Sequence, residues 1–501
     1  MFKEEKEMAE TLEKKSISPV RAILTAVGLI LMFLGGKIVP TWGPMTELGV
    51  AMVCAFVGLV ILITVTNEQI WPACAALLSI IVWGYMKSAD AIFNFVGTTV
   101  IVQMIAICVI CSGLRETGAG QVIAKKLLTM KAIQGKPLLF SAILLIAFLI
   151  ADIFLSTFGG LLFSYAVLDS IGDALGYKKN DKYMQAMAVG LYLAAMLGSS
   201  ILPFSGMVLG ITNAFNAAMG TYGYAFNPAI YIICTIPVGI VFMILYTLCI
   251  RYVYKADMSK LENLDASQLP SLKEVGDKFT ARQIWYIGAF IFGVAYSFVL
   301  LFLPKGTPFQ VWFSGISQCA WFIFVIVLLS IIRVDGAPLM DCNKHFPRGA
   351  MWQSIVTVGV FSMLGGALSS NDLGFKQWLI DVIGPMFSNM SWPVFVLLIV
   401  VVCAVVTNFF SNMATGVIVA TLTAPFAAEF AGKGVNVSVI GTAIALSSMF
   451  AYLTYAAAGP APILLGRDGV ENKFIYGKAI VALPLYIIVA TVLFSIFGFI
   501  F

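Results

Sequence analysis

Apolar runs of about twenty residues recur along the whole chain and decide what it can fold into. Hydrophobic residues make up 60% of the 501 positions, and charged residues make up only 11%. In lipid, every backbone N–H and C=O group must be paired within the chain, so such runs predict helices. The sequence therefore predicts an all-α polytopic protein of the cell membrane, with the lipid bilayer around it.

Hydropathy predicts eleven transmembrane helices and two re-entrant hairpins. The hairpins cover residues 137–175 and 392–430. The predicted spans are 22–39, 47–65, 70–86, 95–112, 183–220, 226–250, 283–303, 310–332, 350–370, 437–466 and 477–500. Met1 to Ser18, with five Glu and four Lys, is interpreted as a cytoplasmic or interfacial segment rather than a cleavable signal peptide.

Lysine and arginine predict the orientation. The basic residues gather in the loops 113–136, 178–182, 251–282, 333–349 and 467–478, which are assigned to the cytoplasm. The predicted outer loops hold one lysine apiece: Lys37, Lys87, Lys305, Lys376 and Lys433. If either hairpin crossed the membrane fully, every later loop would change sides. We therefore predict a cytoplasmic N-terminus and an external C-terminus.

The same order of elements occurs twice. A short amphipathic helix follows Leu114, then a hairpin with Ser156 at its tip, then a span interrupted at 198–206. The second copy has a short helix after Gly374, a hairpin with Ser411 at its tip, and a span interrupted at 456–462. Because the first copy begins inside and the second outside, we predict an inverted repeat, which is typical of secondary transporters.

Polar residues at the hairpin tips and breaks are candidate binding groups. Helix N-termini at a tip favour anions, and carbonyls freed at a break, with Ser, Thr and Asn oxygens, suit sodium. Pro203, Pro460 and Pro462 prevent the helix from closing over each break. The alternative is that Gly, Ser and Pro serve only close helix packing. Four breaks in two pairs favour the binding interpretation.

The order, spacing and tip residues of the chain from about Thr41 to Phe501 resemble the divalent anion:sodium symporter family, within the ion transporter superfamily. The resemblance implies a homodimer that imports a small organic anion with sodium by an elevator movement. It implies one sodium at Ser156, Thr157 and Ser205, and another at Ser411, Asn412 and Gly459. It also implies a substrate site with these members: Thr157, Phe158, Pro203, Asn412, Met413, Thr415 and Pro460.

The same resemblance implies a division into domains. Residues 1–20 form a cytoplasmic segment, and 251–282 form a cytoplasmic loop. Scaffold helices, each set with an interfacial helix, occupy 21–136 and 283–391. The two halves of the transport domain, each with one hairpin, occupy 137–250 and 392–501.

The tips depart from the family pattern. The family carries Ser-Asn-Thr at both tips, whereas this chain has Ser156-Thr157-Phe158 and Ser411-Asn412-Met413. Fewer hydrogen-bond donors, together with Phe158 and Met413, disfavour a substrate with two or three carboxylates. A dicarboxylate remains the family's expected substrate, and a smaller or more apolar anion is the alternative.

Asp152 lies one helical turn before Ser156, deep in an apolar run. Carboxylates inside the membrane are costly and usually functional. Asp152 is therefore a candidate coupling residue that binds sodium or, in a cation/proton antiporter-like or proton-coupled anion transporter, carries the proton. The alternative is an Asp capped by nearby hydroxyls in an inner vestibule.

Other classes of function lack support. A formal charge of +5, scattered along the chain, makes nucleic acid an unfavourable partner. The only histidine, His345, falls in a predicted inner loop, so we predict neither an enzyme nor a His-based metal site. Cys108 and Cys111 have redox spacing but are interpreted as packing residues. Sodium is the predicted ion, and no organic cofactor is expected.

Overall fold

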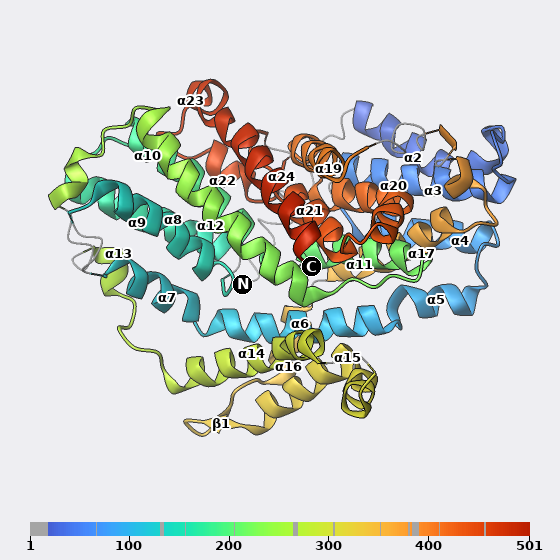
Figure 1. Cartoon of the computed structure of the whole chain (residues 1–501), viewed down its shortest axis with the longest axis horizontal. Coiled ribbons are helices and arrows are strands. Elements are labelled where there is room, and N and C mark those ends of the chain that lie inside the picture. The colour runs from blue at the N-terminus through green and yellow to red at the C-terminus, as the bar shows by residue number, and fades with distance from the viewer. Residues whose placement is uncertain are drawn as a thin grey trace, which may run out of the picture.

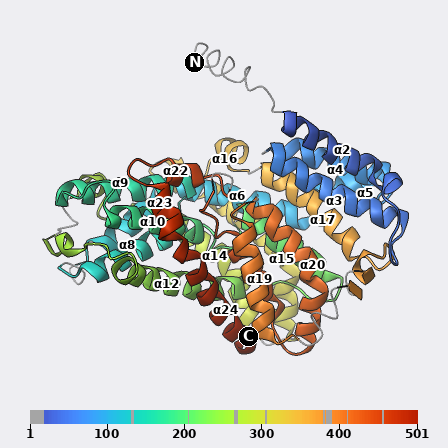
Figure 2. The same cartoon turned by 90° about the horizontal axis from the view of Figure 1, so that it is seen from above.

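The computed structural model of the chain is built almost entirely of helices (Figure 1). It describes residues 19–66, 68–130, 135–155, 157–204, 206–263, 269–303, 306–350, 352–378, 381–382, 390–409, 411–454 and 457–501. The charged segment that ends at Ser18 lies outside the described residues. In the two views, helices α8, α9, α10 and α12 lie at one end of the molecule, and α2 to α5 lie at the other (Figures 1 and 2).

In the described part of the chain, six helices precede the first hairpin. Small residues allow α2 and α3 to approach closely, since a Cβ at Gly35 would overlap Cys54 and one at Gly58 would overlap the Gly28 carbonyl. Helix α7 is the predicted short amphipathic helix. The bounds of these helices are α2 Pro19–Ile38, α3 Glu47–Thr66, α4 Ile70–Val82, α5 Ser88–Val96, α6 Thr99–Glu116 and α7 Ala119–Leu128.

Two helical hairpins lie where the sequence predicts them. Each hairpin is followed by a helix that ends in a break and then resumes as a second, separate helix. In the first copy the helices are α8 Pro137–Ala151, α9 Thr157–Leu175, α10 Lys182–Gly198, α11 Gly206–Gly220 and α12 Pro228–Tyr252. In the second they are α19 Trp392–Val406, α20 Asn412–Gly432, α21 Val437–Ser448, α22 Ala461–Leu465, α23 Asn472–Gly477 and α24 Ala482–Ile500, with a 3₁₀ turn at Ala479–Val481.

The two copies are in register with a constant spacing of 255 residues. Helices of the first copy begin at positions 137, 157, 182 and 206, and their counterparts begin at 392, 412, 437 and 461. The hairpin helices α8 and α19 have the same length, 15 residues. Asp152 and Thr407, which follow these two helices, are therefore equivalent positions. Thr157 and Asn412, which open the next helices, are equivalent too.

The segment between the copies contains one unpredicted break. Helix α15 bends by 71° at Ser317, which has a positive φ of 62°, whereas the sequence predicted an uninterrupted span at 310–332. Gly315 lies two residues before Ser317, but a single glycine inside an apolar run is common in membrane helices, so the sequence carried little warning. The elements of this segment are η2 Ser259–Asn263, α13 Pro270–Lys273, α14 Ala281–Phe302, α15 Pro308–Ile331, β1 Arg333–Val334, β2 Ala337–Pro338, α16 Cys342–Gly349 and α17 Trp352–Ser369.

Within the described residues, four helices are long and apolar enough to cross a membrane unaided, and up to six are if two bent pairs each count as one span. The four are Pro19–Ile38, Pro228–Tyr252, Asn412–Gly432 and Ala479–Ile500. One of the four, helix α20, belongs to the second hairpin. It is long enough to cross a membrane, although the sequence predicts a re-entrant hairpin there. The fold is that of a multi-pass membrane protein, and the count of eleven spans stays a prediction.

Candidate functional site at the hairpin tips

The tip of the first hairpin buries a carboxylate. Asp152 follows the last residue of α8 and has no exposed surface. Neither of its carboxylate oxygens has a hydrogen-bond partner among the described residues. A Cβ at Gly160 of α9 would overlap Oδ1, and a Cβ at Gly198 would lie 3.0 Å from the Asp152 Cβ. Two glycines thus make room for a carboxylate beside the end of α10, where the first break begins.

The equivalent place in the second copy holds neutral oxygens. The Thr407 hydroxyl lies 2.8 Å from Asn412 Oδ1 and 2.5 Å from the Ser448 carbonyl oxygen, at the end of α21. All three residues are buried. A hydroxyl has one hydrogen, so it can donate to only one of these two acceptors at a time. Three oxygens that share one hydrogen form a group that suits a hard cation.

Asn408 ties the second tip to the second break. Its amide oxygen accepts from the backbone N–H groups of Tyr452 and Leu453 at 2.8 and 2.9 Å. Its amide nitrogen donates to the carbonyls of Ala404 and Phe450 at 2.6 and 3.1 Å. The buried amide is fully hydrogen-bonded, and it fixes the course of the chain after α21. The equivalent residue of the first copy is Ile153, which cannot do this.

Hydroxyl groups from neighbouring helices satisfy carbonyls that the breaks leave free. Tyr231 donates to the Ser200 carbonyl at 2.6 Å, and Tyr476 donates to the Leu453 carbonyl at 2.8 Å. Tyr192, on α10 of the first copy, donates to the Ala451 carbonyl of the second at 2.8 Å. Because carbonyls inside a membrane protein need a donor from the chain, these hydroxyls help to make an open helix tolerable there.

We expect Tyr192→Phe to lower the free energy of unfolding by about 1–3 kcal/mol, because it leaves the buried Ala451 carbonyl without a donor. The measurement is the thermal unfolding of the purified protein in detergent. Tyr252→Phe is the matched control, since Tyr252 is 65% exposed. Equal melting temperatures for Tyr192→Phe and the wild type would show that the hydroxyl does not support the break.

The remaining predicted site residues fall into three groups. Phe158 of the first tip, half exposed, faces Gly459 of the second break, since a Cβ there would lie 3.3 Å from the Phe158 ring. Met413 and Thr415 are buried behind the second tip, and the Thr415 hydroxyl has no partner. The predicted members Thr157 and Ser411 are partly buried, whereas Pro203 and Pro460 are buried. Ser156 and Ser205 lie outside the described residues.

The structure changes one predicted pairing. The sequence placed Asn412 with the turn near Gly459, but Asn412 contacts the start of the break, where its amide nitrogen lies 3.9 Å from the Met449 sulfur. Thr407, Asn408 and Ser448 were missed in the sequence because they stand outside the Ser-Asn tip. A search at a fixed spacing of 255 residues would have paired Asp152 with Thr407.

Ion pairs join the two copies at the face that the charge pattern assigns to the cytoplasm. Arg467 pairs with Asp169 at 2.5 Å, and Lys179 pairs with Asp468 at 2.7 Å. The hydrogen bond between Lys179 and Asp468 lowers the pKa of the Asp468 carboxyl and raises the pKa of the Lys179 ammonium group. The Gln185 side chain also accepts from the Glu471 N–H at 3.0 Å. These contacts hold the loop after α22 against the first hairpin.

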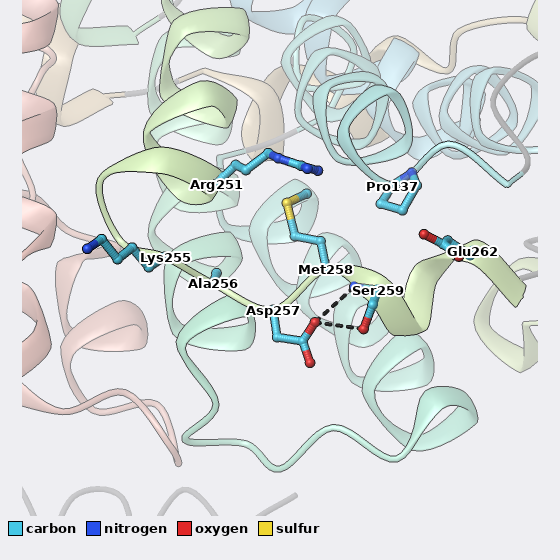
Figure 3. Close-up of a pocket in the computed structure, with 8 residues that line it drawn as sticks. All are labelled: Pro137, Arg251, Lys255, Ala256, Asp257, Met258, Ser259 and Glu262. Carbon is cyan, nitrogen blue, oxygen red and sulfur yellow. Dashed lines mark hydrogen bonds between the residues drawn. The ribbon is translucent and has the colours of Figure 1, made fainter.

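Two of the cavities lined by described residues border helices of the first copy and lie away from the tips. One, of about 430 Å³, opens beside the C-terminal end of α12 and the start of α8 and contains both acidic and basic side chains (Figure 3). Its lining is Pro137, Arg251, Lys255, Ala256, Asp257, Met258, Ser259 and Glu262. The other, of about 270 Å³, lies between α11 and α17 and is lined by uncharged residues, among them Asn94, Thr98, Asn213, Asn216 and Ser362. Neither contains a predicted site residue.

Paired hairpins and broken helices, with oxygens buried where they meet, define a secondary membrane transporter. Comparison with known families agrees with this class. The chain belongs to the family described as the sodium:sulfate symporter transmembrane region, whose model matches residues 20–500. The symporter resemblance and the membrane-transporter fold are thereby confirmed.

The fold is also similar to the crystal structure of the YdaH transporter of Alcanivorax borkumensis, which is described as having an unusual topology. The TM-score is 0.51 at 14% sequence identity, and the match covers 81% of this chain and 88% of that one. No curated protein matches the sequence.

Proposed function

We propose that this protein imports a small organic anion, a carboxylate or a related compound, together with sodium. The observation that carries the proposal is the meeting of buried oxygens at both tips of a chain in the sodium:sulfate symporter family. A buried carboxylate that has no hydrogen-bond partner among the described residues is compensated by the charge of a bound cation or a proton, and a group of oxygens that shares one hydrogen suits a bound cation. Sodium supplies that charge.

The proposed sodium ions occupy one place in each copy. At the first tip the oxygens come from Asp152 and Thr157, with Ser156 and Ser205 as further expected members. At the second they come from Thr407, Asn412 and the Ser448 carbonyl, with Ser411 beside them. The anion lies between the tips, where its carboxylate touches Thr157 and Asn412, with Phe158 beside it.

Proton coupling is the second candidate, and the absence of a hydrogen-bond partner for Asp152 favours it equally well. Asp152→Asn separates the two. If sodium binds there, the variant needs at least about tenfold more sodium but keeps a sodium dependence. If a proton is carried, the variant loses the pH dependence of uptake and concentrative uptake, yet it still exchanges substrate. Normal sodium affinity, pH dependence and accumulation together would exclude both roles.

Alternating access by an elevator movement of the two hairpin copies, in a homodimer, is part of the proposal. The cross-copy contacts of Tyr192, Arg467 and Lys179 support it, because they join the two hairpin regions into one unit that could move as a body. Helices α11 and α17 border the same cavity. A cross-link between one residue of α11 and one residue of α17 should hold the protein in one conformation and stop uptake. Full uptake after complete cross-linking would contradict the movement.

The orientation can be tested by cysteine labelling. Cysteines introduced at Lys179 and Lys473 should react only from the cytoplasm, and one at Lys433 only from outside, because the basic loops are retained inside. Labelling of position 179 from outside would mean that the first hairpin crosses the membrane and that the two copies are not inverted.

The most direct test of the function is a thermal-shift screen of the purified protein against organic anions, with sodium or potassium as the cation. A ligand that binds only the folded state raises the melting temperature. We expect at least one carboxylate to stabilise the protein in sodium and not in potassium. Stabilisation that is equal in both salts would contradict sodium coupling.

A further inference from the structure

We infer that the transported anion carries a single negative charge, because Asp152 cancels the charge of one of the two coupling cations. This inference rests on the proposed function and narrows its substrate class.

Asp152 is the sole charged residue of the two hairpin copies at membrane depth. The sequence segments 137–168, 183–250, 382–428, 434–466 and 479–501 contain both hairpins and both breaks, and Asp152 is their only Asp, Glu, Lys, Arg or His. No arginine or lysine is therefore available between the tips to balance a charge on the substrate. Apart from the partial positive charge of the helix N-termini at the tips, the balance has to come from the cations.

The register of the copies shows that the two cation places differ in charge. Thr407 and Asp152 are equivalent positions, and both are fully buried. The Thr407 hydroxyl has neighbours at 2.8 and 2.5 Å, while the Asp152 oxygens have no hydrogen-bond partner in the described part of the chain. A cation beside Asp152 leaves no net charge, whereas a cation beside Thr407 leaves one positive charge.

The charge left over matches a monoanion. With both cations bound, the tips and Asp152 together carry one positive charge, which one carboxylate neutralises. A dianion would leave one negative charge uncompensated in a region without water, and such burial is strongly unfavourable. The half-exposed ring of Phe158 and the buried Met413 supply no donor for a second carboxylate.

The test compares anions of similar size that differ in charge. Butyrate, lactate, succinate and sulfate are offered to the purified protein at saturating sodium, near pH 8, and binding is followed by thermal shift and by calorimetry. We expect a monoanion to bind at least about 100-fold more tightly than succinate or sulfate, because the dianions bury an unpaired charge.

A variant reverses the charge balance. Asp152→Thr gives the first tip the neutral side chain of its counterpart, so at saturating sodium the loaded site should carry two positive charges. We expect the ratio of dianion to monoanion affinity to rise at least about tenfold. Asp173→Asn is the matched control, since Asp173 is an exposed acid on the neighbouring helix α9, and it should leave the ratio unchanged.

The outcomes distinguish this inference from the proposed function. Sodium-dependent binding that favours succinate or sulfate in the wild type would overturn the monoanion and leave sodium coupling intact. Binding of no anion in sodium would contradict the proposed function itself. If Asp152→Thr does not fold, the inference is tested with the wild-type protein alone. The comparison of anion affinities is then supported by the electrical current per transported anion in proteoliposomes. With two sodium ions per monoanion, we expect one net positive charge per anion taken up, and zero would overturn the inference.

Discussion

Asn408→Leu is expected to remove most of the folded protein. Leucine has a similar shape but cannot pair with the Tyr452 and Leu453 N–H groups or the Phe450 carbonyl, all of which are buried. Buried groups without partners cost about 1–3 kcal/mol each, so we expect a loss of about 4 kcal/mol or more. Since the whole margin of stability is about 5–15 kcal/mol, the loss should be visible as aggregation during purification.

The measurement is the yield of monodisperse protein in size-exclusion chromatography, followed by the melting temperature. Asn371→Leu is the matched control, because Asn371 is exposed and its side chain accepts a hydrogen bond from Lys376 at 3.1 Å. A variant at 408 that behaves like the control would mean that the second break does not depend on this amide.

Asn412→Ala is expected to raise the sodium concentration for half-maximal uptake at least about tenfold. Mutating residues that only hydrogen-bond to the ligands of a metal typically lowers metal affinity about 10–100-fold, and Asn412 is proposed to be a ligand itself. Asn412 Oδ1 lies 2.8 Å from the Thr407 hydroxyl, and alanine removes this oxygen without touching the Ser448 carbonyl. The measurement is the initial rate of uptake into proteoliposomes over a range of sodium concentrations.

Thr423→Val on the same helix α20 is the control for Asn412→Ala. The Thr423 hydroxyl bonds only to the Val419 carbonyl within the helix, so its loss should leave sodium dependence unchanged. A well-folded Asn412→Ala protein with the same sodium dependence as the wild type would show that Asn412 only packs.

Much of the fold follows from the length and composition of the apolar runs. The hairpins at 137–175 and 392–430 and the breaks near Pro203 and Pro460 were predicted within a few residues, because proline, glycine and serine interrupt otherwise continuous hydrophobic segments. The bend at Ser317 was not, because its positive φ occurs at a residue without such a preference.

The site was predictable only in part. Asp152 is conspicuous as a charge in an apolar run, and Asn412 belongs to a tip motif. Asn408 and the tyrosine hydroxyls act on carbonyls 23 to 259 residues away, and no local pattern indicates such partners. The chemical difference between Asp152 and Thr407 appears only when the two copies are aligned.

We propose that a sodium gradient drives the anion into the cell. The measurement that tests it most directly is uptake of a radiolabelled carboxylate into proteoliposomes under an inward sodium gradient, with a potassium gradient and protein-free vesicles as controls. We expect the carboxylate to accumulate transiently inside the vesicles, above its external concentration, with the sodium gradient and not with the potassium gradient. Dissipating the sodium gradient should abolish this accumulation. Accumulation to the same level in potassium, or uptake that never exceeds equilibrium in sodium, would contradict it.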